Sequence, residues 1–298
     1  MIGMFTRVFV IASHTFTQLV RMKVFGFLAV FALILIGVNF FELPSGNSPA
    51  AAAEEELKML KSSAMGAMSL FAIIFAVSAT GLLLPRDVED RTLYTILCKP
   101  VPRLDYLAGK YLGVLWTIFL ALLLMDILLV VALHFRTAET LAERLALAEG
   151  LKWTPAEIEL ERQDILAQGA TWTVQAGVFA IFLKSMVIAG VALLISTFST
   201  STLFTIIMGF LVYFIGHFAG EAREFWLYQQ LDPSPLMKYG SHLVSVVFPD
   251  FRLYNVIDGA IAGQPIPAPL MWSLIGISLI YASVYLILSW FTFAKKEF

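Results

Sequence analysis

The sequence predicts an all-α membrane protein that crosses the bilayer several times, and three observations support this fold class. The chain of 298 residues is 59% hydrophobic and 14% charged, with a mean hydropathy of +0.82, whereas soluble domains carry about 25% charged residues. Several apolar runs reach the roughly 20 residues that a helix needs to cross a bilayer. Because backbone groups inside lipid must hydrogen-bond within their own segment, these spans are expected to be helices.

The apolar runs and the charges that end them predict six spans. These are residues 24–41, 64–84, 111–134, 173–195, 203–220 and 270–293. Only the hydroxyl-rich run STFSTST (196–202) separates the fourth span from the fifth, but a single helix of that length would far exceed the hydrocarbon thickness. We therefore expect a helical hairpin there and a single transmembrane domain over residues 1–298.

The positions of lysine and arginine predict the orientation of the spans. Basic residues lie close to span ends on the short segments 1–23, 85–110 and 294–298, and are diluted over the longer loops between the other spans. We predict a multi-pass protein of the cell (inner) membrane with both termini cytoplasmic. The extracytoplasmic loops are then residues 42–63, 135–172 and 221–268.

The N-terminal segment predicts an amphipathic helix that lies in the inner membrane interface. Its apolar face carries Phe5, Phe9, Ala12, Phe16 and Leu19, and its opposite face carries Arg7, His14, Gln18 and Arg21. The alternative is a helix that packs on the rest of the protein. In either case, we expect it to lead directly into the first span.

The extracytoplasmic loops are expected to be helical in part. The run AAAEEELKMLKSS within 42–63 is expected to be helical and to extend the second span outward, and 135–172 predicts a hairpin of two helices. Thr154 is placed to cap the second of these, with Pro155 in its first turn and Glu157 completing a capping box. The proline- and aromatic-rich loop 221–268 predicts short helices at the outer membrane face.

The inner loop 85–110 predicts a short amphipathic helix outside the membrane. Its start is marked by the carboxylates of Asp87, Glu89 and Asp90, its apolar patch by Leu93, Ile96 and Leu97, and its end by Lys99 and Pro100. A simple connection between two helices takes about 2–8 residues. This longer, capped loop therefore indicates a segment that contacts a partner, or else one that packs on the inner ends of the spans.

Two ionisable residues, Asp126 and Lys184, fall deep inside predicted spans. An isolated charge at mid-bilayer costs about 2.5–3.5 kcal/mol on insertion scales. They are candidates for a substrate path or a conformational latch, with or without contact between them. The alternative is that Lys184 reaches the interface and Asp126 faces outer water.

Other site chemistry finds little support in the sequence. The net charge of −2 does not indicate a nucleic-acid partner, and the single cysteine, Cys98, excludes an internal disulfide. The histidines lack the His-Glu-x-x-His spacing of a zinc protease, so no metal site and no intramembrane hydrolase are expected. The pairs Gly109–Gly113 and Gly216–Gly220 match a Gly-x-x-x-Gly close-packing pattern.

Four features together resemble the permease subunits of ABC-2 type transporters, in the broad group that includes the NosY-like permeases. They are the N-terminal stretch IASHTFTQLVRMKVFGFL, the loop stretch RTLYTILCKPVPRLDYLAGKYLG, six spans with both ends inside, and the segment PDFRLYNVIDGAIAGQPIP before the last span. The loop stretch is similar to the family pattern E-x-R-T-L/I, KPV, R and GK-LG. The resemblance covers essentially the whole chain.

The resemblance implies that the loop 85–110 holds a coupling helix that docks on a separate ABC ATP-binding subunit, two permeases pairing with two ATPases. The residues implied in docking are Arg86, Glu89, Arg91, Thr92, Leu93, Ile96, Leu97 and Lys99. The chain's own Gly109-Lys110 is followed by Tyr111 and lacks the upstream glycine of a phosphate-binding loop. ATP and Mg²⁺ are therefore expected on the partner, and this subunit is expected to be non-catalytic and without a cofactor.

The sequence thus predicts the permease subunit of an ATP-driven exporter, acting as a homodimer in the lipid bilayer. A second hypothesis is an anchoring or energy-transducing component that moves a periplasmic partner through 135–172 without carrying a solute. A third is a secondary transporter, for which Asp126 and Lys184 would form the charged midplane site.

Overall fold

The computed structural model describes residues 3–38, 49–89, 101–151, 153–199, 201–228 and 248–295, and over these ranges it is helical without strands. The elements are α1 (Met4–Val20), α2 (Lys23–Val38), α3 (Pro49–Glu89), α5 (Arg103–Leu151), α6 (Pro155–Gln168), α7 (Trp172–Phe198), α8 (Thr202–Tyr228), the 3-10 turn η1 (Phe251–Tyr254), α10 (Ile257–Ile261) and α11 (Ala268–Ala294). The predicted all-α class is confirmed.

Four helical segments are long and apolar enough to cross a membrane, among the residues that the structure describes. They are Glu55–Pro85, Arg103–Leu151, Pro155–Phe198 and Ala268–Ala294. A shorter apolar stretch, Thr202–Phe218, lies on α8, and the apolar α2 covers 16 residues. The chain is therefore a multi-pass membrane protein by length and composition, and the number of six spans stays a prediction.

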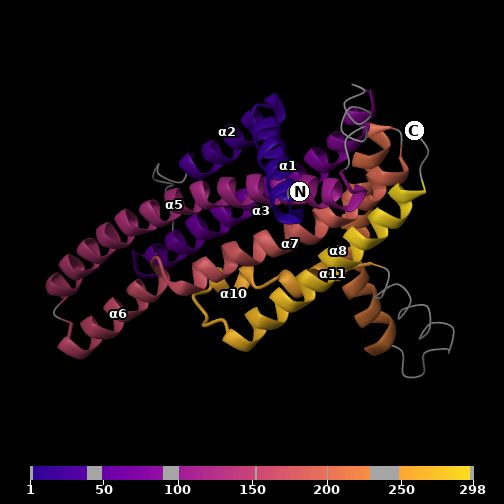
Figure 1. The fold of residues 1–298 in the computed structure, drawn as a ribbon. Helices are drawn as coiled ribbons and strands as arrows, with labels where there is room; N and C mark the ends of the chain where they lie inside the picture. The colour runs from indigo at the N-terminus through magenta and orange to yellow at the C-terminus, as the bar shows by residue number, and fades with distance from the viewer. Residues whose placement is uncertain are drawn as a thin grey trace.

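Helix α7 forms the centre of the bundle and lies between α3 and α11 (Figure 1). Nearly all its side chains between Val174 and Thr197 are buried. By contrast, α11 leaves large apolar side chains such as Ile280 and Phe291 exposed, as expected for a helix that faces lipid. The break between α7 and α8 falls in the hydroxyl-rich run, so the predicted division into two helices is confirmed.

Helices α3 and α5 are much longer than a bilayer requires. They have 41 and 49 residues, about 60 and 70 Å at 1.5 Å per residue, against a hydrocarbon core of about 30 Å. Together with α6 they extend beyond the bundle as a projection (Figure 1). Arg136 on α5 lies 3.6 Å from Glu56 on α3 in this region, so the two helices are linked there by an ion pair.

The projection confirms the predicted helices of the outer loops and corrects their boundaries. Helix α3 begins at Pro49, so part of 42–63 does extend the second span. The predicted hairpin is formed by the end of α5 and by α6, and the first arm continues the third span instead of starting anew. The Thr154 hydroxyl accepts a hydrogen bond from the Glu157 amide, and the Glu157 carboxylate accepts one from the Thr154 amide, as the sequence predicted.

The prediction that Asp87 and Glu89 begin a separate helix is wrong. Helix α3 passes through Pro85 and ends at Glu89, so Asp87 and Glu89 lie in its last turn and do not begin a new helix. A proline inside a helix removes one N–H donor, but Pro85 is buried among packed neighbours, and the helix continues. The remainder of the predicted coupling helix, residues 90–100, lies outside the described residues.

Helix α1 crosses α5 at the first Gly-x-x-x-Gly pair. A Cβ atom at Gly113 would lie 2.8 Å from the Ala12 carbonyl oxygen and 2.6 Å from the Thr15 Cβ, and one at Gly109 would be equally close to Ile11. Glycine is therefore required for this close approach. The face of α1 that packs on α5 carries Ala12, Thr15 and Leu19.

The single apolar face predicted for α1 is thus divided in two. Ala12 and Thr15 contact α5, whereas Phe5 is 89% exposed. Phe9 is 58% exposed and also packs edge-on against Trp116 of α5, with ring centroids 5.3 Å apart. A helical-wheel pattern cannot separate a protein contact from a lipid contact, because both select apolar residues. Packing on the protein is shown, and the location of the exposed phenylalanines in the membrane interface stays a prediction.

The second Gly-x-x-x-Gly pair receives the segment that precedes the last span. A Cβ atom at Gly216 on α8 would lie 2.5 Å from the Pro249 carbonyl oxygen, and one at Gly220 would lie 2.6 Å from the Arg252 Cδ. Phe251 is buried in this contact. The short elements η1 and α10 confirm the predicted short helices over the described part of 221–268.

Candidate functional site

A buried ion pair joins the two helices that flank residues 90–100. Lys110 Nζ on α5 lies 2.6 Å from Asp87 Oδ2 in the last turn of α3. The Tyr106 hydroxyl donates a hydrogen bond of 2.5 Å to the same carboxylate oxygen. All three side chains are buried, with 0% exposure for Tyr106 and 3% for Lys110. We call Asp87, Tyr106 and Lys110 the stem cluster.

Two further contacts tie the stem cluster to other helices. Arg7 on α1 binds Asp105, the neighbour of Tyr106, at 2.7 Å through one guanidinium nitrogen and at 2.8 Å through another. Arg103, at the start of α5, donates hydrogen bonds to the carbonyl oxygens of Phe293 and Ala294 at the end of α11, at 2.7 and 2.9 Å. Four helices, α1, α3, α5 and α11, are therefore joined at the ends of the 90–100 segment.

This arrangement is better suited to transmitting force between helices than to catalysing a reaction. A buried pair whose members are mutually hydrogen-bonded resists separation, because breaking it leaves a charge without compensation. A force applied to residues 90–100 would therefore shift α3 and α5 together, each as a rigid helix. No group of three or more His, Cys, Asp or Glu side chains within the described ranges is placed to hold a metal ion.

The predicted docking residues lie on and beyond this stem. Arg86 and Glu89 are in the last turn of α3, and their side chains are outside the described part. Arg91, Thr92, Leu93, Ile96, Leu97 and Lys99 also lie outside the described residues. Their docking role stays a prediction.

The two intramembrane ionisable residues have different partners. Asp126 on α5 accepts a hydrogen bond of 3.1 Å from the Gln175 side chain on α7. Lys184 on α7 is 8% exposed, and its ammonium group lies 5.3 Å from the ring centroid of Tyr213 on α8. In the described part of the chain, Asp126 and Lys184 do not form an ion pair with each other.

An apolar cavity lies between the first turns of α7 and α11. Its volume is about 390 Å³, within the range of about 300–1,000 Å³ that ligand sites occupy. The lining residues are Trp172, Gln175, Ala176, Phe179, Ile266, Ala268, Met271, Trp272 and Ile275. Trp172 and Trp272 are more than 70% exposed, as is typical of the aromatic belt at a membrane surface.

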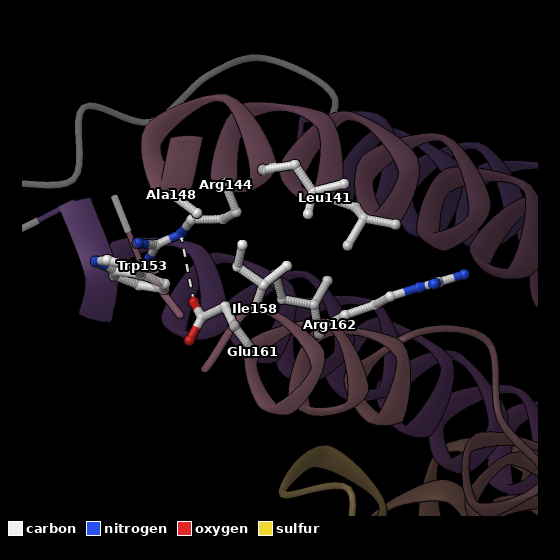
Figure 2. A pocket seen from close by; sticks show the side chains of 9 residues that line it. Leu141, Arg144, Ala148, Trp153, Ile158, Glu161 and Arg162 are labelled. Carbon is white, nitrogen blue, oxygen red and sulfur yellow. Dashed lines mark ion pairs between the residues drawn. The ribbon is translucent and has the colours of Figure 1, made fainter. Parts of the chain in front are cut away.

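A much smaller cavity lies inside the projection (Figure 2). Its volume of about 10 Å³ holds a single water molecule at most. Figure 2 shows Arg144 from α5 and Glu161 from α6 turned toward each other at this cavity, 3.8 Å apart. The pair fixes the two arms of the hairpin and leaves no room for a ligand.

The sequence missed the stem cluster because its members are assigned to different helices. The sequence predicts Asp87 at the start of a new helix and counts Lys110 among the basic residues of the segment 85–110. The available signal was the opposite charge of two residues that flank one loop.

Neither a family model nor a curated protein matches the chain in comparisons with known proteins.

Proposed function

We propose that this chain is the membrane-spanning permease subunit of an ATP-driven ABC-2 type exporter. Residues 90–100 would dock on a separate ATP-binding subunit, and the permease would act as a homodimer. The observation that carries the proposal is the stem cluster. The segment with the family-like pattern is flanked by the buried Asp87–Lys110 ion pair between α3 and α5. The Arg7–Asp105 ion pair and the hydrogen bonds of Arg103 to backbone carbonyls connect this region to α1 and α11.

These contacts support a role in ATP-driven movement, because a loop that only connects two helices does not require them. A buried ion pair costs desolvation energy and is weak support for stability by itself. It does fix the relative positions of the helices that it joins. Force from a nucleotide-driven partner would then reach four helices at once.

The docking step is tested by co-purification of the tagged chain with its ATPase from the native membrane. We expect Mg²⁺-dependent ATP hydrolysis to accompany the wild-type chain and to be lost in Leu93→Asp/Leu97→Asp. The matched control is Leu160→Asp/Leu166→Asp, which places the same charges on exposed positions of α6 and should retain the activity. Hydrolysis that accompanies the docking variant undiminished would refute the docking assignment.

A second candidate function is the anchoring or energy-transducing component. The projection favours it, because both of its arms expose leucines: Leu147 and Leu151 on α5 and Leu160 on α6. Such a surface is suited to a periplasmic partner. The two functions separate in vesicles that contain the purified complex. Substrate-stimulated ATP hydrolysis supports the exporter, and stimulation only by an added periplasmic protein supports the anchor.

A further inference from the structure

Three polar side chains of α7 and α8 lie near the middle of these helices, with Tyr213 in contact with both of the others. Lys184 lies near the midpoint of α7 and places its ammonium group over the Tyr213 ring. His217 is one turn farther along α8, and its ring stacks on that of Tyr213 at a centroid distance of 6.1 Å. Its Nδ1 atom is buried and has no hydrogen-bond partner. We call Lys184, Tyr213 and His217 the midspan cluster.

Lys184 forms no ion pair with any carboxylate whose side chain the structure describes. The Asp126 carboxylate is bound by Gln175. The Asp250 carboxylate, beside Gly220 of α8, accepts a hydrogen bond from the Arg252 amide. Neither forms an ion pair with Lys184. The lysine is 8% exposed, so water does not solvate it as it would a surface charge.

The contact with Tyr213 is too weak to explain a buried lysine. A cation–π contact contributes about 0.5–2 kcal/mol, whereas a lysine at the centre of a span costs about 2.5–3.5 kcal/mol. A buried polar atom without a partner, such as His217 Nδ1, adds to this cost. An apolar residue at position 184 would fit the bundle better if stability were the only requirement.

The hydrogen-bonding capacity of the cluster defines the complementary ligand. The lysine ammonium offers three donors and no acceptor, the tyrosine hydroxyl is a donor, and the histidine ring donates from whichever nitrogen is protonated. Donors with a net positive charge in a region of low dielectric select an anion with several acceptor oxygens. The outer face of α8 exposes Phe214 and Phe218, so lipid is the adjacent medium.

We propose that the midspan cluster is a binding site for an anionic oxygen group, a phosphate or carboxylate. The group is carried by an amphiphile in the bilayer or by a small soluble anion. Lys184 supplies the charge, and Tyr213 and His217 direct hydrogen bonds to the oxygens. Binding of this kind does not depend on the exporter assignment, and it can be measured on the purified chain alone.

The experiment follows the thermal unfolding of the purified full-length chain in uncharged maltoside micelles. The probes are inorganic phosphate, dodecyl phosphate and, as a probe without the anion, dodecanol. We expect dodecyl phosphate to raise the unfolding midpoint, and dodecanol to leave it unchanged. Lys184→Gln should weaken the apparent affinity by about 30-fold, equivalent to about 2 kcal/mol at 1.4 kcal/mol per factor of ten.

Two further variants show whether the effect is specific. Lys184→Arg keeps the charge and should retain most of the affinity, and Asp126→Asn changes an intramembrane ionisable group outside the cluster and should retain all of it. A response to dodecyl phosphate alone identifies an amphiphile, and a response to inorganic phosphate as well identifies a soluble anion. No response of the wild-type chain to either phosphate, or equal affinity in Lys184→Gln, overturns the proposal.

Discussion

Lys110 and Lys184 are both buried lysines of this membrane protein, 3% and 8% exposed, but their surroundings differ. Lys110 binds the Asp87 carboxylate at 2.6 Å in the stem cluster. Lys184 contacts an aromatic ring and forms no ion pair with a carboxylate whose side chain the structure describes. The first charge is compensated by the protein, and the second has only a weak partner. The difference shows that burial alone does not assign a role, since the partner decides between a structural pair and a ligand site.

The largest expected effect comes from breaking the compensated pair. Lys110→Met removes the Lys110 ammonium group from the buried Asp87 carboxylate, and removing one member of a buried pair costs about 3–5 kcal/mol. Thermal unfolding in micelles should show a large fall in the midpoint. The double variant Lys110→Met/Asp87→Asn removes both charges and should recover much of the loss. A single variant as stable as the wild type would contradict the structural role of the pair.

A smaller effect is expected where α1 crosses α5, because α1 supplies Arg7 to the same region. Gly113→Val forces a side chain against the Ala12 carbonyl and Thr15, and overpacking of this kind costs about 1–3 kcal/mol. The control Gly276→Val on α11 meets no atom within 4 Å and should unfold close to the wild-type midpoint. Equal behaviour of the two variants would show that α1 can leave α5 without cost.

The smallest change in the unfolding midpoint is expected from a substitution of Lys184, in contrast to Lys110. Lys184→Met removes a poorly compensated charge from the interior of a span, so the unfolding midpoint should stay the same or rise. The measurement is the same thermal unfolding, without added phosphate. A fall as large as that of Lys110→Met would mean that Lys184 has a strong partner within the protein.

The sequence predicted those features that depend on neighbours along the chain. Apolar length located the four helices that are long and apolar enough to cross a membrane in the described part of the chain. The Thr154–Glu157 capping box was identified from three-residue spacing because both members lie in one turn. The continuation of α5 into the projection was missed for a related reason. Hydropathy falls after His134, but the alanine, leucine and glutamate that follow are strong helix formers, so the helix does not end where the apolar run ends.

The pairing of distant residues could not be predicted. Asp87 and Lys110 meet only because α3 continues through Pro85, and a proline is normally a sign that a helix ends. The intramembrane residues were identified as candidates by their charge alone. That Asp126 binds Gln175, whereas Lys184 faces Tyr213, depends on the rotation of three helices about their axes, which a single sequence does not determine.

The unbroken length of α3 and α5 has a mechanical consequence. The two antiparallel rods are cross-linked twice, by Asp87 with Lys110 at one extremity and by Glu56 with Arg136 toward the other. A tilt of the two helices at the Asp87–Lys110 pair would therefore move their other ends, tens of ångströms away, with little bending of the helices. The tip of the hairpin formed by α5 and α6 would then be displaced whenever α3 and α5 tilt at the opposite side of the bilayer.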